Sequence, residues 1–274
     1  MEAHSPRHRL TQSLHDAITP LWVLLNPRDH VELMLAAILV GTVLGFIGMR
    51  FYDWPLWVAA FVFLALLLVP SAAKWRGDFH RYGFVAMGLS FLIFTQGFHT
   101  IEHIVQWVQY HIMHLSLSQA SGILTPANSE WVHFTWNWIV TIILIVLIVR
   151  GLRNPFAYLF LIWALGHSLE HTYVFVRYLS VLDELKHMGI TGITAQGLPG
   201  ILGEGGWLAH SELTRGTFIS RLPGLATAVR LDIHFWWNMG EFTLLLLATV
   251  TYLHKIIPAR TPARDQAPQL QTSE

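Results

Sequence analysis

The sequence predicts an all-α, polytopic membrane protein with six transmembrane helices, the last four of which form a duplicated bundle of two helical hairpins. Three observations lead to this fold class. The 274-residue chain is 53% hydrophobic and only 12% charged, about half the charged share of a soluble domain. It contains six long apolar segments. Its second half carries the same two polar motifs twice, in the same order.

The six apolar segments are long enough to cross a hydrocarbon core of about 30 Å, which takes about 20 helical residues. They comprise residues 31–49, 54–71, 82–107, 131–149, 155–178 and 233–254. The chain accordingly divides into a cytoplasmic or interfacial N-terminal segment (1–30), a two-helix transmembrane hairpin (31–72), a first motif-bearing hairpin (82–150), a second one (155–256) and a disordered tail (257–274).

The N-terminal segment is too polar for a signal peptide, because it has no uncharged apolar stretch before a cleavage site. Its residues 10–25 are expected to lie flat in the membrane interface, with Pro20 as a break. Of the 17 Lys and Arg residues, 11 fall on the side of the N-terminus and 6 on the other. An excess of positive charge marks the cytoplasmic side. We therefore expect an integral protein of the cell membrane with both termini in the cytoplasm.

The polar motifs lie inside the predicted transmembrane helices. H-x-x-E-H occurs as "HTIEH" at residues 99–103 and as "HSLEH" at residues 167–171. H-F-x-W-N follows each of them, as "HFTWN" at residues 133–137 and "HFWWN" at residues 234–238. Two motifs repeated in one order, each time spread over a helical hairpin, predict an internal duplication with parallel topology.

Helix geometry predicts that the motifs meet. Side chains at positions i, i+3 and i+4 share one helix face. At 1.5 Å per residue, His99 and His103 lie about 12 and 6 Å below the Trp107 end of their segment. His234 and Asn238 fall within the first two turns of theirs. All these ends face outward in the predicted topology, so we expect the four motifs to converge in the outer leaflet.

The converging side chains are typical of a metal site, because imidazole and carboxylate ligands together suit Zn, Fe, Cu, Ni or Mn. The predicted ligands are His99, Glu102, His103, His133, His167, Glu170, His171 and His234. Glu102 and Glu170 are also expected to bridge two ions or to act in catalysis. Asn137, Asn238 and Glu241 are expected to orient a ligand or a bound water. A single membrane histidine is more often a packing residue hydrogen-bonded between helices, but so many polar groups are costly without a common partner.

The leading functional hypothesis is a metal-dependent membrane oxidoreductase. Two iron or copper ions would bind O₂ and oxidise a membrane lipid or another lipid-soluble substrate. The chain shows no electron-transfer domain, so a separate electron donor or a membrane partner subunit is expected. The absence of cysteine excludes disulfides and thiolate ligands. The formal net charge of zero argues against nucleic acid as a partner.

Alternative functions follow from resemblances and from the ligand types. H-x-x-E-H is similar to the inverzincin motif, which implies a zinc-dependent membrane hydrolase with Glu102 or Glu170 as general base. The histidine-rich helices resemble the membrane desaturase and hydroxylase class, which implies two irons, although the chain lacks the H-x-x-H-H boxes of that class. Facing pairs such as His99 and His167 leave open a b-type cytochrome. A metal-handling membrane protein is a further alternative.

The predicted outer loop at residues 179–231 is rich in glycine but lacks the spacing of a phosphate-binding loop. It connects the last two predicted helices on the outer side. We expect it to lie over the mouth of the histidine cluster as a lid or a docking surface.

Overall fold

The structure is a computed structural model that describes residues 19–190 and 197–257. Its elements are η1 (Arg28–His30), α2 (Val31–Phe51), α3 (Leu56–His111), η2 (Thr125–Asn128), α4 (Glu130–Val149), α5 (Pro155–His187), α6 (Trp207–His210), η3 (Phe218–Arg221) and α7 (Arg230–Ile256). Residues 19–25 are also helical, and no residue in the described ranges forms a strand. The predicted all-α class is therefore confirmed for the described chain.

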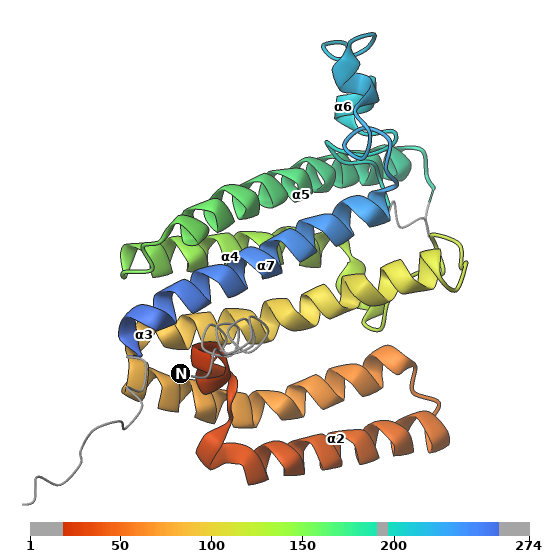
Figure 1. The fold of residues 1–274 in the computed structure, drawn as a ribbon. Helices are drawn as coiled ribbons and strands as arrows, with labels where there is room; N and C mark the ends of the chain where they lie inside the picture. Colours follow the sequence, from red (N-terminus) through yellow and green to blue (C-terminus); the bar gives the residue numbers. More distant parts are fainter. Residues whose placement is uncertain (1–18, 191–196, 258–274) are drawn as a thin grey trace, which may run out of the picture.

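The long helices lie side by side, and successive passes run in opposite directions (Figure 1). The connections after α2, α3 and α5 lie together at one end of the bundle, which we call the loop end. The bend within α3, the α4–α5 turn and the end of α7 lie at the opposite end. In the bundle α7 packs against both α3 and α5, α4 packs against α5, and α2 packs against α3.

Helix α3 reverses direction at Gly83, whose φ of 83° and ψ of −179° are not helical. Lys74 and Ser90 are 16 residues apart, yet Nζ of Lys74 donates to Oγ of Ser90 at 3.0 Å. A straight helix would separate them by about 24 Å. The rings of Trp75 and Phe91 are likewise 5.1 Å apart. The two predicted segments 54–71 and 82–107 therefore lie on the two antiparallel arms of α3.

Three helices of the described chain are long and apolar enough to cross a membrane: α2, α3 and α4. Helices α5 and α7 are long but carry several polar motif residues, which lower their hydropathy. The fold is thus that of an all-helical protein whose long apolar helices are compatible with an integral membrane protein. The six-span count stays a prediction.

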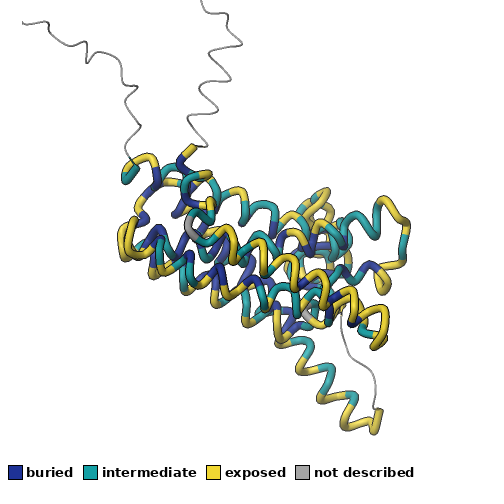
Figure 2. The backbone as a smooth tube through the Cα atoms, turned by 90° about the horizontal axis from the view of Figure 1, so that it is seen from below, coloured by how far each residue is buried: buried dark blue, intermediate teal, exposed yellow. Residues whose placement is uncertain are grey.

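Helix α2 shows how the apolar helices pack. Its buried residues are Gly41, Gly45 and Gly48. An added Cβ would lie 2.9 Å from the Phe63 ring at Gly41 and 2.1 Å from the Trp54 ring at Gly48, so only glycine allows this approach. Such faces of small residues are typical of helix packing in lipid. The rest of α2 exposes large apolar side chains. Figure 2 shows the same division, with buried residues along the inside of the bundle.

The apolar core lies between the second arm of α3 and helices α4, α5 and α7. Leu24, from the helical residues 19–25, is fully buried in it. Pro20 lies within this helical stretch, and the remainder of the predicted interfacial segment lies outside the described residues, as does the predicted tail from residue 258. Near the bend of α3, Lys74 forms a buried ion pair with Asp78 at 2.5 Å.

The outer connection is shorter than the predicted loop at residues 179–231. Helix α5 continues to His187, nine residues beyond the predicted end of its segment at Tyr178, and α7 begins at Arg230. In the extension "LSVLDELKH" the apolar residues recur at helical spacing, with polar residues between them. The helix therefore continues beyond the apolar segment. The connection contains α6 and η3 and projects from the loop end (Figure 1).

Candidate metal centre

Six histidine side chains meet inside the bundle toward its loop end. His99 and His103 come from the second arm of α3, His133 from α4, His167 and His171 from α5, and His234 from α7. These rings form a contiguous chain of contacts, with neighbouring centroids between 4.7 and 6.0 Å apart. We call this group the histidine cluster. All six predicted histidine ligands therefore belong to one cluster.

The first half of the cluster comes from the first motif pair. The ligand nitrogens of His99, His103 and His133 all lie within 4.8 Å of one another. Zinc, copper and iron bind imidazole nitrogen at about 2.0–2.1 Å, so small movements of the three rings would bring one nitrogen from each onto a single ion. This triad could hold a metal ion.

The second half comes from the second motif pair. Nε2 of His167 lies 3.1 Å from Nε2 of His171, and the rings of His171 and His234 are 4.8 Å apart. Two nitrogens on one ion are about 2.9–3.4 Å apart when each bond is near 2.05 Å and the angle lies between square and tetrahedral. His167 and His171 thus have the separation that two ligands of one ion require.

The two halves touch through His133 and His234. The ring of His133 stacks on His171 with centroids 5.0 Å apart and planes inclined by 3°. It also lies 5.8 Å from His234, and His234 lies 6.0 Å from His103. Each half therefore contacts the other through the histidine of its H-F-x-W-N motif.

Several ring nitrogens of the cluster are buried and have no hydrogen-bond partner among the described residues. They are Nε2 of His99, both nitrogens of His103, and Nδ1 of His133, His167 and His171. Buried polar atoms are nearly always paired, because leaving one unpaired costs about 1–3 kcal/mol. A bound ion would supply the missing partner for several of these atoms at once.

Glu241 is the carboxylate closest to this arrangement. Its Oε1 lies 3.1 Å from Nδ1 of His167, which is ion-pair distance, but the angles are not those of a hydrogen bond. The Glu241 side chain is 1% exposed. Its Oε2 accepts a hydrogen bond from Nε2 of Gln96 at 2.5 Å, and Oε1 of Gln96 accepts one from Nε1 of Trp136 at 3.0 Å. Because Nε2 of His167 faces His171, Glu241 lies on the opposite side of the His167 ring, where a group that orients a ligand would lie; its predicted role stays a prediction. Gln96 belongs to neither repeated motif, so the motifs do not predict this contact.

The motif glutamates make different contacts from those predicted. Glu102 accepts backbone hydrogen bonds from Ile123 at 2.9 Å and from Leu124 at 2.8 Å. Glu170 accepts them in the same way from Ile201 at 3.0 Å and from Leu202 at 3.2 Å. Both oxygens of each carboxylate are thus engaged by the connection that follows the helix. In this geometry the glutamates hold the connections, and neither bridges the histidines.

A glycine precedes each of these amide pairs and allows the glutamate to approach. An added Cβ would lie 2.0 Å from Oε1 of Glu102 at Gly122 and 1.8 Å from Oε1 of Glu170 at Gly200. We call each glutamate with its glycine and two amides a clasp. The tripeptide G-I-L forms both clasps, at residues 122–124 and 200–202. This third repeated element is visible in the sequence but lies outside the two histidine motifs, which do not predict it.

The remaining motif residues also occupy matching places. Nδ2 of Asn137 donates to the carbonyl of His133 at 2.8 Å, and Nδ2 of Asn238 donates to the carbonyl of His234 at 2.9 Å. Both asparagines thus bond to the helix turn that carries a cluster histidine. The tryptophans of the two H-F-x-W-N motifs flank the cluster, with Trp136 lying 6.4 Å from His99 and Trp237 stacked 5.3 Å from His167.

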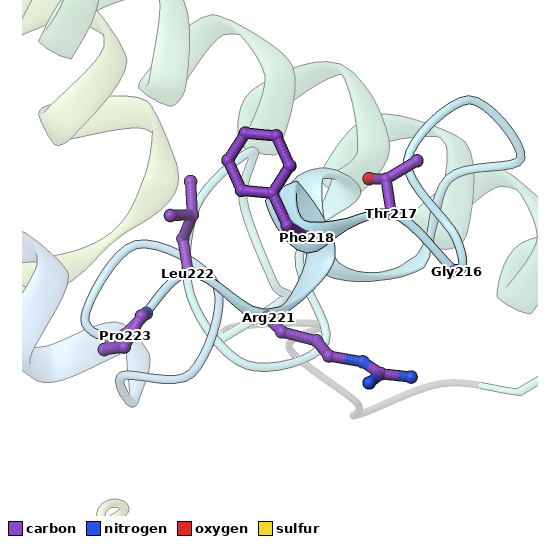
Figure 3. Close-up of a pocket in the computed structure, with 6 residues that line it drawn as sticks. All are labelled: Gly216, Thr217, Phe218, Arg221, Leu222 and Pro223. Atoms are coloured by element: carbon purple, nitrogen blue, oxygen red, sulfur yellow. The ribbon is translucent and has the colours of Figure 1, made fainter.

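A cavity of about 720 Å³ connects the cluster with the loop end. His103, His133 and His234 line it, together with residues of the α3–α4 connection. Glu130 and Arg230, at the first turns of α4 and α7, also line it and form an ion pair at 2.7 Å. A second, more open cavity of about 490 Å³ lies within the α5–α7 connection (Figure 3). Its lining, residues 216–218 and 221–223, includes no residue of the cluster.

Comparison of the chain with protein-family models, with curated proteins and with solved structures found no match. The functional argument therefore rests on the geometry of the histidine cluster itself.

Proposed function

We propose that this protein is an integral-membrane metalloprotein that binds two transition-metal ions, each held by three histidines. One ion would be held by His99, His103 and His133, and the other by His167, His171 and His234. The observation that carries the proposal is the single cluster of six touching imidazole rings, most of which have a buried, unpartnered nitrogen.

The proposal includes an internal duplication and six membrane spans with both termini in the cytoplasm. Three matched features support the duplication: the two clasps, the two asparagine bonds and the two flanking tryptophans. The helix packing agrees with a duplication. In the two repeats α3 corresponds to α5 and α4 corresponds to α7. The packing of α3 against α7 therefore has its counterpart in the packing of α5 against α4. The two arms of α3 supply the second and third spans, and the histidine cluster would then lie in the outer leaflet.

The ligand chemistry favours copper. A ligand set of neutral imidazoles alone suits Cu, Zn, Fe and Ni, and Cu²⁺ has the highest affinity among the divalent ions of this series. Bundles that hold two irons typically supply several carboxylates to the ions. Here the motif carboxylates are engaged in the clasps, and only Glu241 lies beside a histidine. Iron is the second choice.

The reaction class proposed is oxidation by O₂. The six histidines would hold the two ions, and the ions would supply the redox chemistry that reduces O₂. Hydroxylation would consume one substrate, one O₂, two electrons and two protons, and release the hydroxylated product and water. The two electrons would come from a separate donor protein or reductant. The clasps weaken the zinc hydrolase alternative, because a general base needs a free carboxylate oxygen near the bound water. Direct contacts between the rings leave little room for a haem.

The test is O₂ consumption by the full chain purified in detergent, loaded with copper or with iron, and reduced under anaerobic conditions. We expect about one O₂ consumed per two ions and no O₂ uptake by the metal-free chain. No O₂ uptake by either loaded form, together with tight zinc binding and hydrolysis of a model ester, would replace this proposal with the hydrolase. An intense Soret band in protein as purified would make it a cytochrome.

A further inference from the structure

The connection between α5 and α7 includes a small lobe that stands apart from the bundle. We call residues 207–225 the lobe; it contains α6 and η3, which pack against each other. Figure 1 shows α6 beside the end of α5, on the side of the bundle away from α2. The lobe therefore extends across the helix axes, in the direction that is parallel to the plane of a membrane crossed by these helices.

Hydrogen bonds fix the depth of the lobe at its base. The backbone nitrogen of Trp207 donates to the carbonyl of Gly200 at 3.0 Å, and Gly200 belongs to the clasp of Glu170. Nη1 of Arg177 donates to the carbonyl of the residue before Gly200 at 2.9 Å. Arg177 and Glu170 precede Tyr178, the predicted outer end of the apolar segment, and lie about 2 and 12 Å below it along α5. The base of the lobe is thus held where the surface of the hydrocarbon core is expected.

The lobe presents apolar side chains at this level. Leu213 is 81% exposed and Phe218 is 75% exposed, the two highest values among the large apolar side chains of the described residues. Figure 3 shows Phe218 and Leu222 on one side of the η3 backbone and Arg221 on the other. Apolar side chains that enter the acyl chains while an arginine stays near the phosphates are typical of segments that lie in a membrane interface.

The charge of the lobe indicates what would hold it on a membrane. Its formal net charge is only +1, from two arginines and one glutamate: Arg215, Arg221 and Glu212. Attraction between so small a charge and a lipid surface is weak, and salt screens it beyond about 8 Å under physiological conditions. Insertion of apolar side chains therefore supplies the binding, and neutral phospholipids are sufficient.

We propose that the lobe docks on the phospholipid surface beside the bundle, in the leaflet at the loop end, and inserts Leu213 and Phe218 among the acyl chains below the headgroups. The bilayer is the surface that a lobe of this level and direction must meet once the helices span it. This inference rests on the membrane spans of the proposed function and is independent of the metal. Through Trp207 and Gly200 the docked lobe would connect the bilayer surface to the clasp on α5.

The chain contains no cysteine, so a bimane fluorophore on a single introduced cysteine reports on one place without background. Leu213→Cys and Phe218→Cys put the label on the lobe. Met188→Cys is the control in water, because Met188 is 63% exposed and lies about 15 Å beyond Tyr178 along the chain direction of α5. Each full chain is reconstituted in phosphatidylcholine nanodiscs. The quenchers are iodide in the water and a nitroxide attached to a lipid chain close to the headgroup.

We expect the lipid nitroxide to quench both lobe labels about threefold more strongly than the Met188→Cys label, and iodide to show the opposite order, because an inserted side chain is shielded from water. High salt should leave the lipid quenching unchanged. Lobe labels that iodide quenches and the lipid nitroxide does not would overturn the proposal. Lobe labels that neither quencher reaches would also overturn it and would show that a protein partner or a second copy covers the lobe.

A second set of variants tests the two apolar side chains themselves. The label is placed beside them with Glu212→Cys, which should be quenched by the lipid nitroxide. Adding Leu213→Ser and Phe218→Ser should lower this quenching about threefold, because the apolar anchors are lost. The matched pair Met188→Ser and Ile190→Ser, also exposed and apolar but at the end of α5, should leave it unchanged. Equal quenching in both backgrounds would overturn the assigned role of the anchors.

One further label and the metal content separate this inference from the proposed function. Ile142, in the predicted span on α4, is 55% exposed, so a label on Ile142→Cys should be quenched by a nitroxide deep in the lipid chain. An unquenched label there would overturn both the membrane spans and the docked lobe. A quenched label there, with two bound ions and a lobe in water, would remove the docked lobe alone. A docked lobe in a chain that binds no metal would remove only the metal centre.

Discussion

Nε2 of His167 lies 3.1 Å from Nε2 of His171, one helical turn away on α5. Two histidines four residues apart on a helix commonly share one face, but their ring nitrogens need not converge. Here they converge because His167 is flanked on its other sides. Trp237 stacks on its ring, and Glu241 lies 3.1 Å from its Nδ1. The pair therefore has the nitrogen separation that two ligands of one ion would need.

The first prediction concerns Glu241, which stands behind His167. Glu241→Gln replaces the carboxylate that lies 3.1 Å from Nδ1 of His167, on the side of the ring away from His171. We expect the affinity for one of the two ions to fall about 10- to 100-fold, as is usual when the carboxylate behind a histidine ligand is lost. Competition with a chelator of known affinity measures this change. Glu184→Gln, an exposed change near the end of α5, is the control, and equal affinities of both variants would contradict the assigned role.

The second prediction concerns the clasps. In Gly200→Ala the new methyl group would lie 1.8 Å from Oε1 of Glu170, so the carboxylate must leave its two amides. We expect this to cost about 2 kcal/mol, because hydrogen bonds to charged groups contribute about 1.5–3 kcal/mol each and a new contact elsewhere recovers part of that. Thermal unfolding in detergent should show a melting temperature lower by several degrees.

The control for the clasp is Gly97→Ala, whose added methyl group would meet Phe242 at an ordinary 3.5 Å. Because Gly97 is helical, that variant should be as stable as the wild type or more stable. If Gly200→Ala and Gly97→Ala unfold alike, the Glu170 clasp does not hold the connection.

The third prediction concerns the reversal of α3. Gly83 has a backbone conformation that is accessible almost only to glycine, and an added Cβ would meet nothing within 4 Å. Gly83→Ala therefore tests backbone strain alone, and we expect a loss of about 1–3 kcal/mol of stability. Gly77→Ala, equally free of contacts but helical, should be neutral or stabilising. A Gly83→Ala protein as stable as Gly77→Ala would show that α3 does not turn there.

The fourth prediction concerns removal of the metal. A ligand present at about 100 times its dissociation constant stabilises the folded state by about 2.7 kcal/mol. Treatment with a strong chelator should thus lower the melting temperature by several degrees, and added metal should restore it. The double variant His99→Ala, His167→Ala should show no response to either treatment. A wild-type melting temperature that is indifferent to chelator would mean that the cluster is held by packing alone.

Helical spacing was enough to predict which histidines meet. The i, i+3, i+4 rule and the depth of each motif brought His99, His103, His167 and His171 to one level, and the structure has them in one cluster. The same rule misled for Glu102 and Glu170. It gives the direction in which a side chain points, but the partner found there depends on the path of the connection. The G-I-L segments return into the bundle and reach the carboxylates first.

Other parts of the site could not be predicted from periodicity. The pair of Glu130 and Arg230 joins two helix starts that are 100 residues apart, and neither residue belongs to a repeated motif. Gln96 reaches Glu241 across two helices in the same way. Such contacts depend on which helices become neighbours. The packing of α3 against α7 does not follow from the order of these helices in the chain.

The most direct test of the central claim is the metal-to-chain ratio of the full protein and of the single variants His99→Ala and His167→Ala, measured by elemental analysis after purification in detergent with copper or iron supplied. The two-ion centre predicts about two ions in the wild type and about one in each variant, because each variant removes a ligand of one ion only. A wild type without bound metal, or two folded variants that each keep both ions, would contradict it.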